Sequence, residues 1–491
     1  MSSAEQDTPE SFDVVVIGGR ISGAALSIQL AGAGRSVLVV DRAQFPSDTL
    51  STHLIQVSGV RSMQKLGVLD ALASTGAPFL TAAAVDYDGI ELSAPVRAEA
   101  DWPPGGISIN RNLLDIILVD AAREAGVQVR TKTSLVDVRR DAAGRVNGVV
   151  LRGKDGEYLV HTGLLVGADG RNSKVAQLIG ARTYNVTENQ RFVYWAEFEG
   201  ANETGSPAVH HYRRGEKLTV AFQSDGGRFV VMICPGLEEF SQFKRNLPQS
   251  YDDAVADCAP LRGLLADAHR ASRPIGTAYA PGYFRESAGA GWVLVGDAGH
   301  FKDPTLGQGI SDALRQAEAL AEHVSAVGVT DRVGLDRQLR RWYRWRDADA
   351  TPMYWLGWDF AKAGELGPLE RALMACISAD PTIRQQFVDG VLSHRVSPYE
   401  VIGPRLLVAV ARRLRRAGCP PLEVARLIGV RLRDELRHQM LLRRPKYAPL
   451  PKPSGAASAA KIRDGDAWAG DIAEDRTPVD LAEGARRAHN H

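Results

Sequence analysis

The stretch Val14-Val15-Val16-Ile17-Gly18-Gly19-Arg20-Ile21-Ser22-Gly23 decides the fold of this chain. Residues 14–17 are apolar and mostly β-branched, which is typical of a buried strand. Gly18 allows a sharp turn out of that strand, and Gly23 lets a helix over residues 24–33 pack close against it. Because the amino end of a helix presents free N–H groups and a positive dipole, we expect this turn to bind a pyrophosphate.

A second predicted strand, residues 36–40, ends at an acidic residue. Asp41 follows Gly18 by 23 residues, close to the roughly 20 expected for the acid that binds ribose hydroxyls in a dinucleotide fold. We therefore place Asp41 and the neighbouring Arg42 at the adenosine end of a bound dinucleotide.

Two further glycine-acid motifs follow in a fixed order. One is Gly167-Ala168-Asp169-Gly170-Arg171-Asn172-Ser173; the other is Gly296-Asp297-Ala298-Gly299-His300, followed by Pro304 and by Gly307-Gln308-Gly309. Each motif alone is a weak signal, but all three in this order predict an FAD-binding protein.

With these motifs the chain resembles the class A flavoprotein monooxygenases, the group typified by para-hydroxybenzoate hydroxylase. It also shares features with the geranylgeranyl-reductase and flavin-dependent halogenase branches. The resemblance covers roughly residues 12 to 360. The resemblance implies that the ADP half of FAD is bound by Gly18, Gly19, Arg20, Ser22 and Gly23, with Asp169 beside the pyrophosphate. It places Asp297 on the ribityl chain, and Pro304, Gly307 and Gly309 beside the isoalloxazine. It also implies that Arg111 contacts the cofactor and that His53 lies along the flavin ring.

Arg20 departs from the pattern, since it stands where the second glycine of the fingerprint usually lies. That glycine lets the backbone approach the pyrophosphate, so a Cβ there crowds the loop. We expect a tolerated substitution with slightly altered loop geometry. The alternatives are an arginine that reaches a phosphate or the flavin, and a weakened site in a chain that no longer turns over.

The predicted fold is α/β, with a discontinuous Rossmann-type FAD-binding domain, an antiparallel-sheet substrate domain and a helical C-terminal region. The predicted boundaries are 12–75, 105–184 and 275–330 for the FAD-binding domain, 76–104 and 185–274 for the substrate domain, 331–447 for the helical region and 448–491 for a disordered tail. Strand-like runs at 192–198, 218–222 and 229–234, separated by glycine turns, predict the antiparallel sheet.

The segment 361–447 carries no family signature. Residues 406–414 and a stretch ending near 440 predict two helices, broken by Gly418 and Pro420-Pro421, and this end is markedly basic. We expect a solvated helix pair packed on the body. Contact with an acidic membrane surface or a partner protein is the less favoured alternative.

Composition excludes several classes of protein. The 44% hydrophobic and 24% charged shares are ordinary for a globular enzyme, and the net charge of +1 gives no reason to expect a nucleic-acid partner. The four cysteines have no metal-binding spacing, so we expect neither a metal site nor disulfides. No apolar run is long enough to span a membrane, and we expect a cytoplasmic location.

Only one dinucleotide fingerprint is present, so we expect no separate NAD(P)H domain. The resemblance implies an FAD-dependent oxidoreductase in which NADH or NADPH docks transiently, or a separate flavin reductase supplies reduced flavin. O2 then forms a flavin C4a-hydroperoxide that hydroxylates an aromatic or polyketide-like small molecule, as in secondary metabolism. No catalytic residue is assigned. The candidates for residues that line the substrate pocket or adjust the reactivity of the flavin are His53, Tyr212, Arg213, Pro304 and Tyr354.

Three alternatives remain open. A geranylgeranyl-type reductase of an apolar substrate consumes reductant without O2. A flavin-dependent halogenase is less favoured, because Trp342-Tyr343-Arg344-Trp345 does not match the Trp-x-Trp-x-Ile-Pro signature of many halogenases. A flavin-binding protein that has lost turnover is the alternative outside the enzymes, motivated by Arg20 and by Ala176, which stands where the second motif usually ends in arginine.

Overall fold

The computed structural model describes residues 10–47, 49–328 and 330–453. Its first layer is an eight-stranded mixed sheet whose parallel core has the order β21-β11-β1-β2-β8. These strands are β1 Glu10–Ile17, β2 Val37–Val40, β8 Gln128–Arg130, β11 Gly156–Gly167 and β21 Trp292–Leu294, and the antiparallel strands β9 Ser134–Arg140, β10 Val146–Gly153 and β20 Ala288–Gly289 complete the sheet.

The apolar run of β1 is buried on both sides, as parallel strands require. Val14 and Val16 join the core beneath α1 (Ile21–Gly32), α4 (Arg111–Glu124) and α8 (Gly309–Ser325). Val15 and Ile17 face a second core, which β9, β10 and α5 (Lys174–Ile179) cover. The predicted Rossmann-type domain is therefore confirmed. The helix predicted over residues 24–33 begins earlier, at Ile21, and ends at Gly32.

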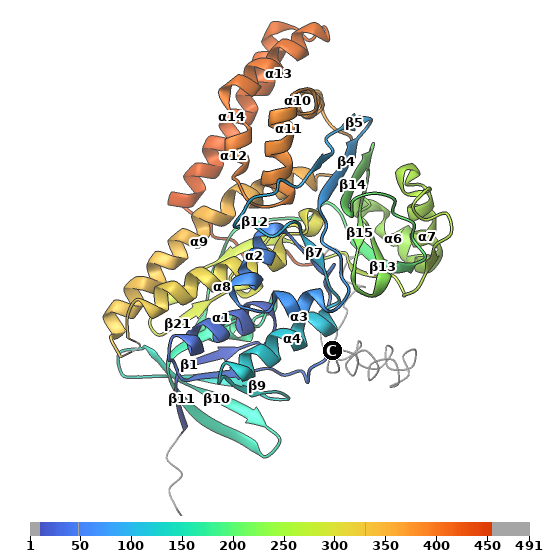
Figure 1. Cartoon of the computed structure of the whole chain (residues 1–491). Coiled ribbons are helices and arrows are strands. Elements are labelled where there is room, and N and C mark those ends of the chain that lie inside the picture. The colour runs from blue at the N-terminus through green and yellow to red at the C-terminus, as the bar shows by residue number, and fades with distance from the viewer. Residues whose placement is uncertain (1–9, 48, 329, 454–491) are drawn as a thin grey trace, which may run out of the picture.

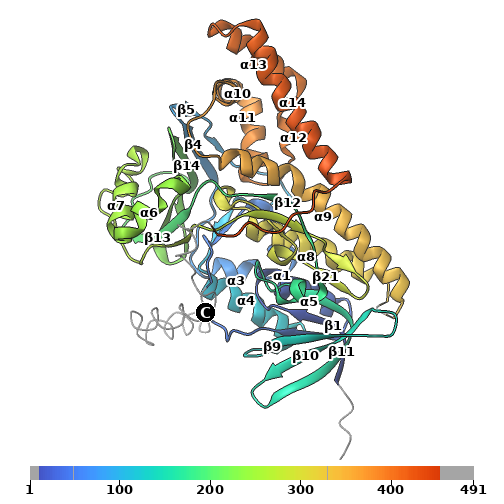
Figure 2. The same cartoon turned by 180° about the vertical axis from the view of Figure 1, so that it is seen from behind.

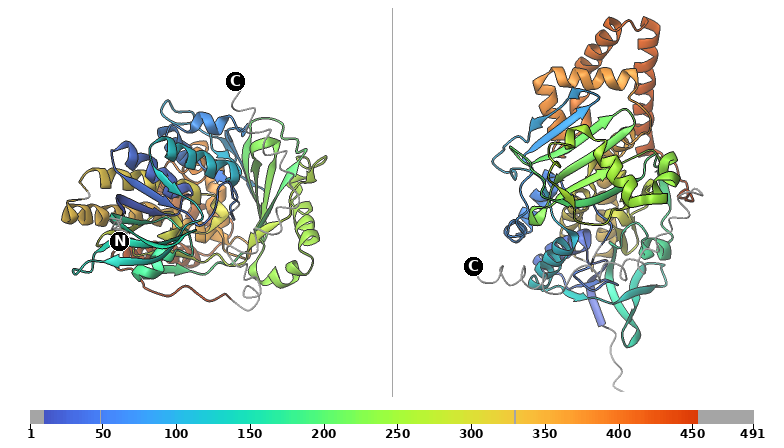
Figure 3. Two further views of the ribbon diagram at one scale, coloured as in Figure 1. Left: turned by 90° about the horizontal axis from the view of Figure 1, so that it is seen from below. Right: turned by 90° about the vertical axis from the view of Figure 1, so that its right-hand side faces the viewer.

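The second layer is a nine-stranded, mainly antiparallel sheet in the order β17-β13-β16-β15-β14-β4-β5, with β18 on β13 and β6 on β4. Its strands are β4 Ala82–Tyr87, β5 Ile90–Glu91, β6 Ala94–Pro95, β13 Val193–Glu199, β14 Ala208–Arg214, β15 Lys217–Gln223, β16 Phe229–Ile233, β17 His269–Arg270 and β18 Ile275–Thr277. The helices α6 (Phe240–Phe243) and α7 (Leu247–Ala256) lie on its outer side (Figure 3). Residues 76–104 thus add strands to this sheet, as expected.

Two small sheets connect the layers. The three-stranded sheet contains β12 Thr183–Thr187, β19 Gly282–Arg285 and β22 His300–Phe301, and the two-stranded sheet pairs β3 Leu54–Ile55 with β7 Ile107–Ser108. The short helices α2 (Val57–Lys65) and α3 (Leu69–Ala73) follow β3.

The C-terminal region is helical, as predicted. Its elements are α9 Arg332–Phe360, α10 Pro368–Ala379, α11 Pro381–Phe387, the π-helix η7 Val388–Leu392, α12 Pro398–Val401, α13 Pro404–Arg416 and α14 Pro421–Arg443. Pro352 lies inside α9, which is one helix of 29 residues. Figures 1 and 2 show α13 and α14 as a hairpin that projects from the rest of the molecule.

Most of the predicted disordered tail, residues 454–491, lies outside the described residues. Its first residues contact the body: the Ala448 N–H donates to the Thr183 carbonyl at 3.1 Å, and Tyr279 Oη donates to the Pro451 carbonyl at 2.5 Å. The described chain therefore contacts β12 at Ala448 and Tyr279 at Pro451.

Candidate FAD-binding site

The glycine turn after β1 requires glycine at two positions. Gly18 has φ +103°, and a Cβ there would lie 2.4 Å from the Ala168 carbonyl oxygen of the second motif. A Cβ on Gly23 would lie 1.8 Å from the Gly18 carbonyl oxygen. No side chain caps the start of α1 within the described chain, so the N–H groups of its first turn remain available for an anion.

Asp41 holds the shape of this turn. One carboxylate oxygen accepts the Gly19 N–H at 2.8 Å and the other accepts the Ala43 N–H at 2.8 Å. Because each carboxylate oxygen can accept a second hydrogen bond, Asp41 can still accept one from a ribose hydroxyl. The adjacent Arg42 is exposed.

The Arg20 side chain turns toward α4. It donates to the Ser47 carbonyl at 3.1 Å and the Ser47 hydroxyl at 2.9 Å, and it forms an ion pair with Asp115. Asp115 is fully buried and also accepts from Arg111 Nε and Nη2, each at 3.0 Å. One carboxylate thus binds two predicted cofactor-site arginines, which favours the tolerated-substitution interpretation of Arg20. Sequence reasoning missed Asp115, although its spacing from Arg111 is that of a helical i,i+4 pair.

The second motif contributes backbone rather than a free carboxylate. Asp169 accepts from Ser173 Oγ at 2.5 Å and from the Lys174 and Val175 N–H groups at 2.6 and 3.1 Å, so it caps α5. Burial raises the pKa of this carboxyl. The part of the motif that reaches the glycine turn is the Ala168–Asp169 peptide, which lies directly against Gly18.

Asp297 in the third motif has the properties expected of a cofactor ligand. Its backbone is fixed, because Tyr283 Oη donates to the Asp297 carbonyl at 2.7 Å and Arg285 donates to the next carbonyl, of Ala298, at 2.8 Å. No hydrogen bond to its carboxylate occurs among the residues that the structure describes, and burial raises the pKa of that carboxyl to about 6. A partly exposed carboxylate with no protein donor suits the ribityl hydroxyls of FAD.

The loop after the third motif leads into a long helix. Pro304 opens the short turn η6 (Pro304–Leu306), Gly307 has φ +60°, and α8 then begins at Gly309, where a Cβ would meet nothing within 4 Å. No side chain caps α8 in the described structure, so its first N–H groups can face the pyrimidine edge of a flavin. The buried Lys302 bonds Gln308 Oε1 at 2.7 Å and pairs with Asp312 at 2.7 Å, which braces this loop from behind.

His53 lies on a segment bonded to the same loop. The Gln56 N–H donates to Ser311 Oγ at 2.9 Å, and the Gln56 amide donates to the Leu306 carbonyl at 3.1 Å. His53 itself has φ +66° and is buried, and its Nδ1 has no partner in the described part of the chain. Burial, with a smaller effect of Arg111, lowers the pKa of His53 to about 3, so the imidazole is neutral.

The nine-stranded sheet presents an apolar face to this segment. That face forms one core cluster with Leu54 and consists of Leu80, Val193, Trp195, Val209, Leu218, Val220, Phe222, Val230, Met232 and Cys234. On the same face, His211 bonds Tyr87 Oη at 2.7 Å and lies 3.3 Å from the Thr305 carbonyl, where its Nε2–H can donate. Burial lowers the pKa of His211 to about 4, so this imidazole is neutral as well.

Three predicted tuning residues bind the protein scaffold instead. Tyr212 points to the opposite face of the sheet and bonds His210 Nδ1 at 2.8 Å. Arg213 donates to backbone carbonyls at the end of α9, including that of Phe360 at 3.4 Å. Tyr354 donates to the Asn185 carbonyl at 2.7 Å and packs on Phe284, with ring centroids 4.8 Å apart. We carry none of the three into the function proposed below.

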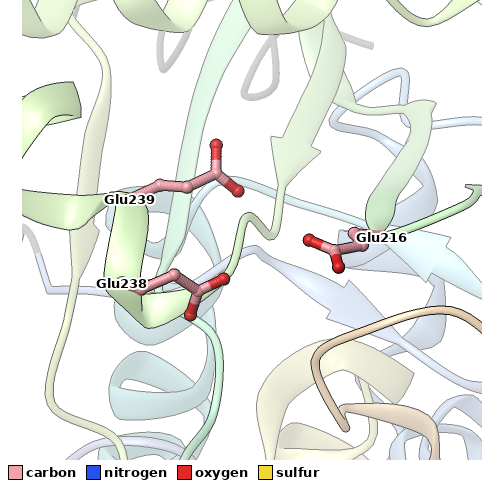
Figure 4. A group of neighbouring side chains, drawn as sticks. All are labelled: Glu216, Glu238 and Glu239. Atoms are coloured by element: carbon pink, nitrogen blue, oxygen red, sulfur yellow. The ribbon is translucent and has the colours of Figure 1, made fainter.

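One acidic group lies outside this site. Glu216, in the β14–β15 turn, and Glu238 and Glu239, in a short 3-10 turn, bring their carboxylates together at the surface (Figure 4). Their oxygens lie within 4.8 Å of one another and all three residues are exposed. Exposed carboxylates are well hydrated, and we assign this group no function.

Comparison with known proteins agrees with this geometry. A model of the FAD binding domain family matches residues 11–260, so the chain belongs to that family. The chain is an FAD-dependent oxidoreductase of the superfamily that also includes monooxygenases, reductases and halogenases.

Individual relatives differ in activity. The chain is 28% identical over 343 residues to a menaquinone reductase of Mycolicibacterium smegmatis, covering 65% of this chain and 78% of that protein. It is 26% identical over 336 residues to the ubiquinone hydroxylase UbiL of Rhodospirillum rubrum, covering 66% and 74%. The flavin-dependent brominase Bmp2 shares the fold, with a TM-score of 0.67 and 18% identity over 83% of this chain and all of Bmp2. No helix among the described residues is both long and apolar enough to cross a membrane.

Proposed function

We propose that this protein is an FAD-dependent monooxygenase that hydroxylates an aromatic or polyketide-like molecule, with NADH or NADPH as a transient reductant. The observation that carries the proposal is the apolar face of the nine-stranded sheet, which packs on Leu54 beside the loop of the third motif. An apolar aromatic substrate fits such a wall, and a similar protein, UbiL, is named as a hydroxylase.

FAD, when bound and reduced, supplies the activation of O2, and the protein positions the reactants and excludes water. The unpartnered Asp297 carboxylate receives ribityl hydroxyls, while the first turn of α1 binds the pyrophosphate. His53 and His211 are neutral and buried, so they add no charge beside this loop.

Isotope incorporation tests this proposal. The FAD-loaded protein is supplied with NADH or NADPH, ¹⁸O₂ and a panel of phenols, hydroxyanthraquinones and quinones, and the products are examined by mass spectrometry. A hydroxylase inserts one labelled oxygen atom into one of these compounds. Substrate-dependent oxidation of the nicotinamide that continues without O2 contradicts the proposal.

The second candidate is a reductase of an apolar substrate, favoured by the similarity to a menaquinone reductase. It predicts turnover under strict anaerobiosis and a product richer by two hydrogen atoms, which the same panel reveals. Bromide added to the aerobic reaction tests halogenation, for which the likeness to Bmp2 supports the fold alone.

A further inference from the structure

The C-terminal hairpin, defined here as α13, α14 and their connection (residues 404–444), differs in charge from the rest of the molecule. It contains 11 arginines and 3 acidic residues, a net charge of +8, whereas the whole chain carries +1. The remaining chain is therefore acidic, and the positive charge is concentrated on one projecting element (Figure 1).

The outer face of α14 is apolar and uncovered. Leu422 is 86% exposed, Leu436 65%, Met440 61% and Leu432 46%. Together with Ala425 and Gly429 these residues recur at three- and four-residue intervals, so they form one stripe along about 27 Å of helix. Of the 23 residues of α14 only Val424 and His438 are buried. The hairpin packs on the body by one side, as expected, because Leu406, Val410 and Val424 belong to a core cluster with α9 and α10, but the opposite face of α14 is left exposed.

Arginines flank this stripe on one side. Helical geometry places Arg426, Arg433, Arg437 and Arg444 next to Leu422, Leu436 and Met440. Arg426 pairs with Glu423, and Arg433 lies 3.8 Å from Asp434. Arg437 and Arg444 have no acidic partner within the described ranges.

A second group of arginines lines an open groove of about 1330 Å³ between α13 and the helices α10 to α12. It consists of Arg405, Arg412, Arg413 and Arg416, none of which forms an ion pair in the described structure. The groove also contains Asp380, which caps α11, and Glu400, in the capping box of α12. Four arginines against two carboxylates leave an excess of two positive charges there. Positive charge is thus in excess on both sides of the hairpin.

We propose that the C-terminal hairpin docks the enzyme on an anionic lipid bilayer, with α14 lying in the headgroup region and its apolar stripe turned toward the acyl chains. An apolar stripe flanked by arginines is the pattern of helices that lie in the membrane interface. Arginine stems can extend along the apolar surface while their guanidinium groups reach lipid phosphates. A second copy is a poor occupant, because pairing two hairpins brings two surfaces of charge +8 together. This proposal does not depend on which reaction the flavin site performs.

Vesicle co-sedimentation of the full-length, FAD-loaded protein tests it. The vesicles contain phosphatidylcholine alone or phosphatidylcholine with phosphatidylglycerol. We expect binding only to the anionic vesicles, weakened by salt. Two variants should each lower the affinity about tenfold or more: Leu432→Ser/Leu436→Ser/Met440→Ser for the stripe, and Arg426→Gln/Arg433→Gln/Arg437→Gln/Arg444→Gln for the charge beside it.

Matched controls lie elsewhere on the surface. Val333 is 69% exposed at the start of α9, and Arg139 and Arg152 are exposed on β9 and β10. Val333→Ser and Arg139→Gln/Arg152→Gln should bind vesicles like the parent protein. FAD content and melting temperature check that every variant is folded, since the hairpin contributes none of the FAD-site residues.

Three results overturn the proposal. The first is no binding to anionic vesicles. The second is binding that is insensitive to the stripe variant, since charge alone then decides the binding and an acidic protein is the better partner. The third is a dimer in sedimentation velocity that the stripe variant abolishes, which assigns the stripe to a second copy.

Discussion

The FAD-binding half and the C-terminal helices of this chain are held together in different ways. In the first, the backbone approaches itself so closely that single atoms decide the geometry, as at Gly18 and Gly23. In the second, side chains interlock: Trp355 of α9 stacks on His438 of α14 at 3.9 Å, and Asp359 pairs with Arg431.

The difference explains why one half carries motifs and the other does not. A close backbone approach permits only glycine, so residue identity is visible in the sequence. Side-chain packing tolerates many combinations of similar volume and leaves no signature. We therefore expect substitutions in the first half to have abrupt effects on FAD binding, and those in the second to have graded effects on stability.

The largest effect is expected for Gly23→Ala. The added Cβ would lie 1.8 Å from the Gly18 carbonyl oxygen, so α1 must move away from the turn. We expect a loss of about 3 kcal/mol of stability and of bound FAD, measured by chemical denaturation and by flavin absorbance. Gly32→Ala, in the same helix but with nothing within 4 Å, should instead be neutral or stabilising by about 0.5 kcal/mol. Equal effects of the two substitutions would refute the close-approach argument.

The second-largest loss of stability is expected for Asp115→Ala. It leaves the guanidinium groups of Arg20 and Arg111 without their shared buried carboxylate, which costs about 3 kcal/mol and loosens the glycine turn. Asp120→Ala, on the same helix but in an exposed pair with Arg123, should cost less than about 0.5 kcal/mol. Denaturation curves with and without FAD measure both. If Asp115→Ala behaves like Asp120→Ala, the Arg20–Asp115–Arg111 group does not support the site.

The elements that the sequence predicted correctly are those with local signals. The β1 turn, the end of β2 before Asp41, the hairpin turns of the nine-stranded sheet and the helix break near Gly418 all follow from glycine, proline or β-branched patterns. The pairing of β4 with β14, and of β5 and β6 with β4, agrees with the expectation that residues 76–104 belong to this sheet.

What the sequence could not predict depends on long-range contacts. Arg20 and Asp115 are 95 residues apart, and no periodic pattern connects them. Tyr354 and Tyr212 were plausible pocket residues by composition, but their orientation depends on which face of α9 or β14 becomes buried. Pro352 inside α9 shows the same limit, since packing of the helix on both sides outweighs the local preference for a break.

Asp297→Asn should have a mixed effect, because its carboxylate is only partly exposed and has no protein donor among the described residues. In the apoprotein the pKa of Asp297 is raised to about 6. The contribution of this carboxyl to the free energy of unfolding is therefore most favourable below about pH 4, and it is lost as the pH rises through 6. The neutral variant should therefore be more stable than the parent apoprotein at pH 7, by about 1 to 2 kcal/mol, a value reduced for the partial exposure of the group.

The same substitution should weaken FAD binding by about tenfold or more, because the ribityl hydroxyls lose a charged acceptor. Affinity of the parent protein should fall as the pH drops below about 6, when Asp297 is protonated, and the variant should lack this pH dependence. Thermal shift of the apoprotein and fluorescence titration with FAD measure the two effects. A variant that binds FAD as tightly as the parent would remove Asp297 from the site.

The smallest effect is expected in the C-terminal half, for His438→Ala. The ring lies parallel to the Trp355 indole, within 2°, and burial lowers its pKa, so a neutral stacked pair is lost. This should cost about 1 kcal/mol of stability and leave the affinity for FAD unchanged. Gln439→Ala, the exposed neighbour on α14, should change neither quantity. A clear loss of FAD binding by His438→Ala would show that α14 is coupled to the flavin loop through α9, and the contrast between the two halves would then fail at the helix that joins them.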